Sequence, residues 1–168
     1  MGPYWDQIIL DKMLKPEDIT AIIDTREQHP LTLELDTIPG TLATGDYSVR
    51  GLEDLLTVER KSLDDLLGCM TSGRPRFERE LKRMQAYDFR CVVVEADWQD
   101  LVKGRYRSRM QPAAATHTIA SWTSLFNVPF QFCGRDRKDV EDFVSFFLFT
   151  TAKKLYERLG HLKNGCKQ

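Results

Sequence analysis

Short apolar runs and alternating apolar and polar positions recur along the chain, and they predict β-strands. The run at 91–95 is β-branched and apolar, which is typical of a strand buried on both faces of a sheet. Two runs on either side of residues 50–54 predict a β-hairpin, and Pro39-Gly40 predicts a turn. The predicted strands cover residues 21–24, 31–35, 45–49, 55–61, 91–95 and 128–133.

Apolar residues at helical spacing lie between and after these strands. Ser62 can cap the first of these helices, since Asp65 occupies the capping-box position three residues later. Pro75 suits the first turn of the second helix. The predicted helices cover residues 62 to about 72, 75 to about 84, 97–102, 112–126 and 135 to about 159. Strands that alternate with helices predict an α/β domain with a mixed central sheet and helices on both faces.

The length of 168 residues fits one domain. We expect a lead-in segment over 1–20, the domain itself over 21–160, and a frayed tail over 161–168. The sequence has no apolar run of about 18 residues and no secretory signal at its start, so we expect no membrane span and a cytoplasmic or DNA-associated location. The cysteines are scattered without any CxxC pair, which argues against zinc and favours free thiols. They are Cys69, Cys91, Cys133 and Cys166.

Basic residues are unevenly distributed, although the net charge is only −1. The segment 101–135 contains no acidic residue, and a second basic cluster surrounds Pro75. This asymmetry allows a basic face beside an acidic site, and phosphate contacts supply most sequence-independent affinity for nucleic acid. A solvated surface explains any single one of these residues equally well. The candidate DNA-binding residues are Arg74, Arg76, Lys103, Arg105, Arg107 and Arg109.

The predicted hairpin carries charged side chains that can converge. Residues two apart in a strand share a face, so Glu59 and Lys61 are expected to point the same way and Arg60 the other way. Pairing within the hairpin brings Asp46 near Glu59. Carboxylates can hold Mg²⁺, which polarises a phosphoryl oxygen and activates water, while a lysine offsets charge in the transition state. This combination predicts phosphodiester hydrolysis; the rival interpretation is an ordinary solvated strand end.

The hairpin resembles the signature of the XPF family of structure-selective endonucleases. The family pattern is GD, a variable gap, then ERK and an Asp four residues after the Lys. It is matched by Gly45-Asp46, Glu59-Arg60-Lys61 and Asp65. Upstream, Asp24-Thr25-Arg26-Glu27 is similar to the D-x-R-E motif of the family. The resemblance spans residues 21–159 and implies a restriction-endonuclease-like core, with 21–160 as the nuclease domain.

This resemblance implies an endodeoxyribonuclease that depends on Mg²⁺ or Mn²⁺ and cuts branched or flap DNA. The catalytic residues that it implies are Asp24, Arg26, Asp46, Glu59, Arg60, Lys61 and Asp65. The metal ligands that it implies are Asp24, Asp46, Glu59 and the carbonyl of Arg60. Structural alternatives stay open: Asp24 can simply end a strand, Asp65 can complete the cap of Ser62, and the two arginines can be ion-pair partners.

The resemblance also implies a homodimer or heterodimer formed through the nuclease domain. The final helix suits this role, because the apolar residues of 143–149 are too contiguous for one helix face; core packing is the rival explanation. The family usually carries a tandem helix-hairpin-helix domain after the nuclease. This sequence shows none, so a separate targeting protein is expected to help select the DNA. Two other functions stay open, a non-catalytic DNA-binding or dimerisation subunit and an RNA-directed nuclease.

Overall fold

A computed structural model describes the backbone of residues 14–165 and the side chains of residues 14–159. The expectations for residues 1–13 and 166–168, including Cys166, lie outside the described residues. Within the expected lead-in, η1 (Pro16–Asp18) is a short 3₁₀ helix. The three cysteines in the described part of the chain are free thiols.

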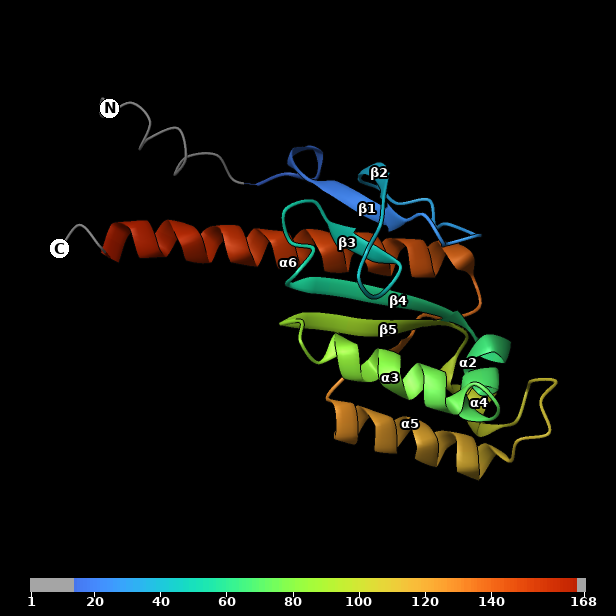
Figure 1. Ribbon diagram of the computed structural model, residues 1–168. Helices are drawn as coiled ribbons and strands as arrows, with labels where there is room; N and C mark the ends of the chain where they lie inside the picture. Colours follow the sequence, from blue (N-terminus) through green and yellow to red (C-terminus); the bar gives the residue numbers. More distant parts are fainter. Residues whose placement is uncertain (1–13, 166–168) are drawn as a thin grey trace.

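A six-stranded mixed sheet forms the centre of the molecule (Figure 1), in the order β2-β1-β3-β4-β5-β6. The pairs formed by β3 are antiparallel and the other three pairs are parallel. The strands are β1 (Thr20–Asp24), β2 (Asp36–Gly40), β3 (Tyr47–Val49), β4 (Leu56–Ser62), β5 (Phe89–Glu95) and β6 (Phe130–Phe132). The predicted fold class and the predicted hairpin are confirmed.

Helices cover both faces of this sheet. The helices are α2 (Leu63–Met70), α3 (Arg74–Met84), α4 (Trp98–Val102), α5 (Pro112–Phe126) and α6 (Arg137–Gly165). On one face, Val92 and Val94 of β5 pack in a core cluster with residues of α2, α3, α4 and α5. On the other face, Cys91 and Val93 pack with residues of α6. Alternate residues of β4 and β5 therefore face different helices.

The directions of the strands bring the ends of β1, β4 and β5 and the start of β3 to one edge of the sheet. Ile23 pairs with Tyr47, and Tyr47 pairs with Val58, so the end of β1 lies beside the start of β3. Because β4 and β5 run parallel, Ser62 and Glu95 end their strands side by side. This edge, where α2 begins, lies at the right-hand side of Figure 1. Loops at the carboxyl ends of parallel strands are where α/β proteins usually place their sites.

The strand predicted over 31–35 is wrong, as is the turn predicted at Pro39-Gly40, since the strand forms at Asp36–Gly40. Side chains from elsewhere satisfy the backbone of the earlier segment: the N–H groups of Leu31 and Glu34 donate to the Tyr47 hydroxyl and Ser145 Oγ. Pro39 fits within β2 because β2 is an edge strand, where a missing N–H costs no ladder bond.

The last helix is longer than expected, since α6 reaches Gly165 and includes residues 161–165 of the expected tail. Val144 and Leu148 are fully buried against the sheet, whereas 61% of Phe146 is exposed. The apolar run is therefore divided between the core and the surface. Among the described residues, no helix combines the length and apolar character needed to cross a membrane.

Candidate active site

Gly45 brings the start of β3 close to β4. Its φ of +81° favours glycine, and a Cβ atom there would lie 2.1 Å from Thr57 Oγ1 and 2.9 Å from the Val58 carbonyl oxygen. This close approach lets the Asp46 N–H donate to the Val58 carbonyl at 2.8 Å, while the Asp46 carbonyl accepts from the Asp24 N–H at 2.8 Å. Asp46 is thus fixed between the end of β1 and the middle of β4.

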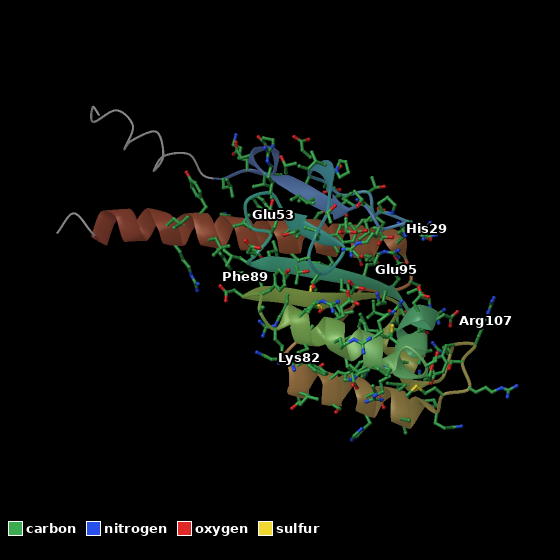
Figure 2. All side chains as sticks on the ribbon, viewed as in Figure 1. His29, Glu53, Lys82, Phe89, Glu95 and Arg107 are labelled. Carbon is green, nitrogen blue, oxygen red and sulfur yellow. The ribbon has the colours of Figure 1, made fainter. Side chains whose placement is uncertain are left out.

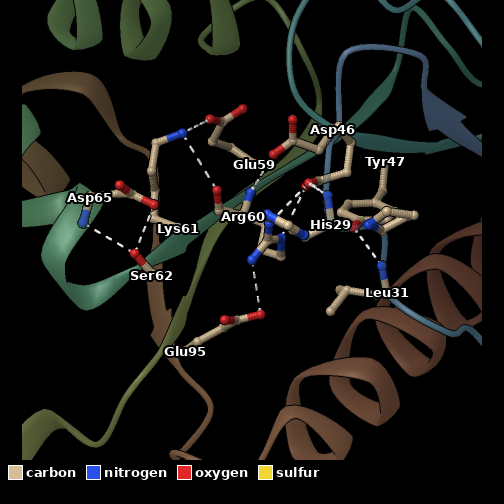
Figure 3. Close-up of polar contacts among 12 residues, drawn as sticks. His29, Leu31, Asp46, Tyr47, Glu59, Arg60, Lys61, Ser62, Asp65 and Glu95 are labelled. Atoms are coloured by element: carbon tan, nitrogen blue, oxygen red, sulfur yellow. Dashed lines mark hydrogen bonds and ion pairs between the residues drawn. The ribbon is translucent and has the colours of Figure 1, made fainter.

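The side chains of β4 alternate between the two faces of the sheet, as predicted. Figure 3 shows Glu59 and Lys61 on the same side of the strand as the carboxylate of Asp46, and Arg60 on the opposite side. The register explains this division, since Glu59 pairs with Val92, Arg60 with Val93 and Lys61 with Val94. Glu59 and Lys61 therefore face α3, where the Lys61 ammonium lies 5.5 Å from the centre of the Phe77 ring.

Two carboxylates and one ammonium group share the α3 side of the strand. Lys61 Nζ contacts Glu59 Oε1 and lies 3.4 Å from the Arg60 carbonyl oxygen. Burial raises the pKa of Glu59, and the charge of Asp46 raises it further. Burial also raises the pKa of Asp46, although its Oδ2 accepts a hydrogen bond from the Arg60 N–H at 2.8 Å. Two buried carboxyl groups thus face one ammonium group, an arrangement that favours protonation of the acids.

The opposite side of the strand is fully paired. Arg60 donates to both oxygens of Glu27, at 3.0 and 2.9 Å, and to Glu95 Oε1 at 3.0 Å. Burial would raise the pKa of Glu27, but the hydrogen bond from Arg60 brings it below the ordinary value. Glu95 Oε1 also accepts from Arg137 Nη1 at 3.2 Å. Arg60 thereby ties β4 to the segment after β1 and to the end of β5.

Asp24 ends β1 with both carboxylate oxygens engaged. Oδ1 accepts from the N–H and Nε of Arg26 at 2.8 and 2.7 Å, and Oδ2 accepts from Arg26 Nη2 and the Leu42 N–H at 2.9 and 2.7 Å. The hydrogen bond from Arg26 is the main cause that lowers the pKa of Asp24 to about 2. Asp24 is buried behind Arg26, which lines an open cavity at this edge of the sheet.

Asp65 takes part in the cap of α2. The Ser62 hydroxyl accepts from the Asp65 N–H at 3.1 Å and donates to Asp65 Oδ2 at 2.7 Å. Ser62 caps the helix as predicted, but the pair is not a capping box, since Asp65 Oδ2 accepts from the Ser62 hydroxyl and not from the Ser62 N–H. Asp65 both lines the cavity and stabilises the start of the helix.

An open cavity of about 680 Å³ lies at this edge of the sheet, and Asp46, Lys61 and Arg76 line it. A second cavity of about 340 Å³ shares Asp64 with the first and is lined by Arg105 and Arg107. Figure 2 shows His29, Glu95 and Arg107 toward the same end of the molecule, with Arg107 on the loop after α4.

The predicted basic residues occupy different positions around these cavities. Arg74 is engaged elsewhere: Nε donates to Glu78 Oε1 at 2.8 Å, and the guanidinium lies 5.3 Å from the centre of a Trp122 ring. Lys103 and Arg109 are exposed on the loop that carries Arg105 and Arg107. The structure thus brings Arg76, Arg105 and Arg107 to the cavities and directs Arg74 towards α5.

The cluster suits a hard divalent cation by the chemistry of its donors. Carboxylate and carbonyl oxygens are the ligands that Mg²⁺ prefers, and two buried carboxylates with raised pKa values gain from added positive charge. The oxygens that converge belong to Asp46, Glu59 and the Arg60 carbonyl. Within residues 14–159, no group of three or more acidic, histidine or cysteine side chains is gathered for a metal. Asp24 is bound to Arg26.

Several charged residues around the site were not predicted from the sequence. Glu95 and Arg137 complete the paired side of β4, and Asp100 binds Arg135 at the second cavity. Glu95 had a detectable signal, since it ends a buried strand that runs parallel to the strand carrying Glu59. Arg137 had no such signal, because its hydrogen-bond partners lie more than 40 residues away along the chain.

Solved structures show the same arrangement of elements. XPF from Aeropyrum pernix is 21% identical, with a TM-score of 0.64 over 82% of this chain and 67% of that chain. XPF from Aeropyrum pernix in complex with DNA is 24% identical, with a TM-score of 0.63 over 81% of this chain and 66% of that chain. The chain thus spans about two thirds of the length of each. Fold and site together define a nuclease-fold α/β protein.

A family model describes the chain more specifically. The model of the ERCC4 domain matches residues 23–147, which include the whole hairpin and the segment after β1. The chain belongs to the ERCC4 domain family, and the resemblance carried by the GD and ERK motifs is confirmed. No curated protein matches the sequence.

Proposed function

We propose that this chain is an endodeoxyribonuclease that depends on Mg²⁺ or Mn²⁺ and cuts branched or flap DNA. The observation that carries the proposal is the convergence of Asp46, Glu59, Lys61 and the Arg60 carbonyl beside an open cavity. A buried pair of carboxylates with one ammonium group is poorly satisfied by itself, and such arrangements are concentrated at functional sites. Membership in the ERCC4 domain family supports the same activity.

Asp46, Glu59 and the Arg60 carbonyl would hold the ion, with Asp24 as a further ligand if it gives up a bond to Arg26. The ion supplies a Lewis acid that polarises the phosphodiester and activates water. Lys61, whose ammonium contacts Glu59 at the cavity, would stabilise the charge that develops on the phosphate. Arg60 holds the strand in place through Glu27 and Glu95, and Asp65 fixes the start of α2 at the cavity wall.

The DNA is proposed to follow the two cavities that meet at Asp64. Arg76 lines the first cavity with Asp46 and Lys61, and Arg105 and Arg107 line the second. These contacts are to the phosphate backbone, so they favour a DNA shape over a base sequence. The structure of XPF in complex with DNA supports DNA as the substrate class.

A dimer through α6 and a separate targeting protein complete the proposal. The exposed Phe146 is an apolar aromatic side chain on the outer face of α6, and aromatic residues are enriched at protein interfaces. Sedimentation of the purified chain tests this part: we expect a concentration-dependent dimer, and a monomer at all concentrations would overturn it.

The test of the activity is a cleavage assay on labelled duplex, flap, fork and single-stranded DNA with Mg²⁺, Mn²⁺ or EDTA. We expect metal-dependent cutting of the flap and fork. Glu59→Gln and Lys61→Ala are each expected to lower kcat by at least about 100-fold, because each removes a group that acts on the transition state. Asp54→Asn in the exposed turn of the same hairpin is the matched control and is expected to cut normally.

Each alternative predicts a different result of this assay. Binding of branched DNA with no cutting in any metal would overturn the nuclease and support a non-catalytic subunit. Cutting of a matched RNA substrate in preference to the DNA would overturn DNA as the substrate. Cutting that survives both substitutions would show that the activity does not depend on this cluster.

A further inference from the structure

We infer that Arg137, the first residue of α6, is a positioning residue for the candidate active site. It lies outside the cluster on the α3 side of β4, and it reaches the site from the opposite face of the sheet. The inference deepens the proposed function, on which its kinetic consequence rests. Its structural consequence stands independently of that function.

Arg137 holds the wall of the cavity by backbone contacts. Its Nη2 donates to the carbonyl oxygens of His29 and Pro30, at 2.6 and 2.8 Å. Residues 26–29 line the cavity, so the two carbonyl groups lie at the end of that wall. Arginine suits this task because its planar group carries several donors in a fixed geometry, whereas lysine offers a single nitrogen.

The same guanidinium shares a carboxylate with Arg60. Glu95 Oε1 accepts from Arg137 Nη1 at 3.2 Å and from Arg60 Nη1 at 3.0 Å. Glu95 is thereby held between two arginines, and its position fixes the guanidinium of Arg60 on the α6 side of β4. Arg137 Nε also lies 3.6 Å from Glu141 Oε1, one turn along α6, which orients the arginine from its own helix.

The backbone of Arg60 contacts Asp46 and Lys61 in the candidate active site, so the position of Arg60 affects both residues. Its N–H donates to Asp46 Oδ2, and its carbonyl oxygen lies 3.4 Å from Lys61 Nζ. Its side chain meanwhile binds both oxygens of Glu27, which lies on the wall that Arg137 holds. The segment after β1, strand β4 and the start of α6 are therefore joined through Arg60, Arg137 and the carboxylates of Glu27 and Glu95. A small displacement of reacting groups lowers the rate of a reaction steeply.

The experiment compares Arg137→Gln and Arg137→Lys with Lys138→Gln as the matched control. Lys138 is the next residue, carries the same charge, and pairs with Glu34 and Asp142. Two quantities are measured: hydrogen exchange of the His29 and Leu31 amides, and kcat and KM on the DNA that the chain cuts. The control is needed because losing any cation from this surface weakens nonspecific attraction of DNA.

We expect Arg137→Gln to speed exchange of both amides about 10-fold and to lower kcat about 10-fold, with KM changed less than about 3-fold. Arg137→Lys should recover part of both losses, and Lys138→Gln should change neither. A merely structural role would lower the folded fraction and leave kcat per folded molecule unchanged. Exchange in Arg137→Gln equal to that in the control, or an equal kcat, would overturn the inference. If the wild-type chain cuts nothing, the proposed function fails, and the exchange rates alone decide the positioning.

Discussion

The two sides of strand β4 differ in how well their charges are matched. On the α6 side, Arg60 is bonded to Glu27 and Glu95, and burial leaves only 13% of its side chain exposed. On the α3 side, Lys61 contacts Glu59, the Asp46 carboxylate accepts from the Arg60 N–H, and burial raises the pKa of both acids. Neighbouring residues of the same strand thus belong to two different groups: Arg60 is paired with two carboxylates, whereas Glu59 and Lys61 belong to a cluster with two carboxyl groups and one ammonium group.

This contrast separates residues that hold the site from residues that act in it. A network in which every donor has an acceptor rigidifies the backbone. A cluster with excess buried negative charge costs stability and is retained where a ligand or a reaction needs it. The paired side therefore predicts effects on folding, and the unpaired side predicts effects on ion binding and chemistry.

The largest expected effect comes from breaking the paired side. Arg60→Met keeps an unbranched apolar stem in the strand but removes the arginine partner of the Glu27 side chain, which is only 6% exposed, and leaves Glu95 with Arg137 alone. We expect the free energy of unfolding to fall by about 3 kcal/mol, since removing one partner of a buried ion pair strands the other charge. Urea denaturation at pH 7 measures this change.

Arg79→Met on the exposed face of α3 is the control for that substitution, with an expected change within about 0.5 kcal/mol. Similar losses in the two variants would show that the network around Arg60 does not hold the fold. Acid should reduce the difference between wild type and Arg60→Met. The lowered pKa of Glu27 stabilises the folded wild type above its unfolded pKa, and this contribution disappears as the pH falls through the folded value.

A smaller effect of opposite sign is expected on the unpaired side. Burial raises the pKa of Asp46 to about 6. Because this folded pKa lies above the unfolded value, wild-type stability falls as the pH rises through that range. Asp46→Asn keeps an oxygen that can accept from the Arg60 N–H but removes the charge. We expect it to add about 1–2 kcal/mol to the free energy of unfolding at pH 8 in EDTA.

The stabilisation by Asp46→Asn should vanish at pH 4, where the wild-type carboxyl is already protonated in the folded state. Asp54→Asn, in the exposed turn of the hairpin, is the control. Measurement requires urea melts of the three proteins at several pH values. Equal stabilities of wild type and Asp46→Asn at pH 8 would contradict the view that this side is electrostatically unsatisfied.

The local part of this site could be predicted from the sequence. Strand alternation placed Glu59 and Lys61 together and Arg60 opposite, and the hairpin placed Asp46 near them. The glycine at 45 was part of a motif, and its physical reason is the close approach of Thr57. The cap formed by Ser62 and Asp65 follows from a spacing of three residues. Each of these features depends on neighbours within about 15 residues, which the sequence displays directly.

Features that depend on distant segments could not be predicted in the same way. Residues 31–35 alternate like a strand, but contacts with Tyr47 and α6 satisfy their backbone, so β2 forms later. The hydrogen-bond partners of Arg137 are separated from it by 42 to 108 residues. No local pattern encodes such contacts, because they exist only once the sheet order is established. The engagement of Asp24 by Arg26 was local but ambiguous, since the same spacing suits a metal ligand.

The smallest expected effect is that of substituting Asp24 on the affinity for a metal ion. The oxygens of Asp24 accept four hydrogen bonds, whereas Asp46 Oδ2 accepts one, from the Arg60 N–H. We therefore expect Asp24→Asn to weaken Mn²⁺ binding only about 3-fold, against at least about 10-fold for Asp46→Asn. Isothermal titration of Mn²⁺ into the three proteins at pH 8 measures the difference. An equal loss of Mn²⁺ affinity in the two variants would show that Asp24 is a direct ligand of the ion. Arg26 would then have to release the Asp24 carboxylate when the ion binds. A smaller loss for Asp24→Asn than for Asp46→Asn would mean that Asp24, like Arg60, holds the site in place. Asp24 would then have a structural role although β1, which it ends, lies next to the strand that begins after Asp46.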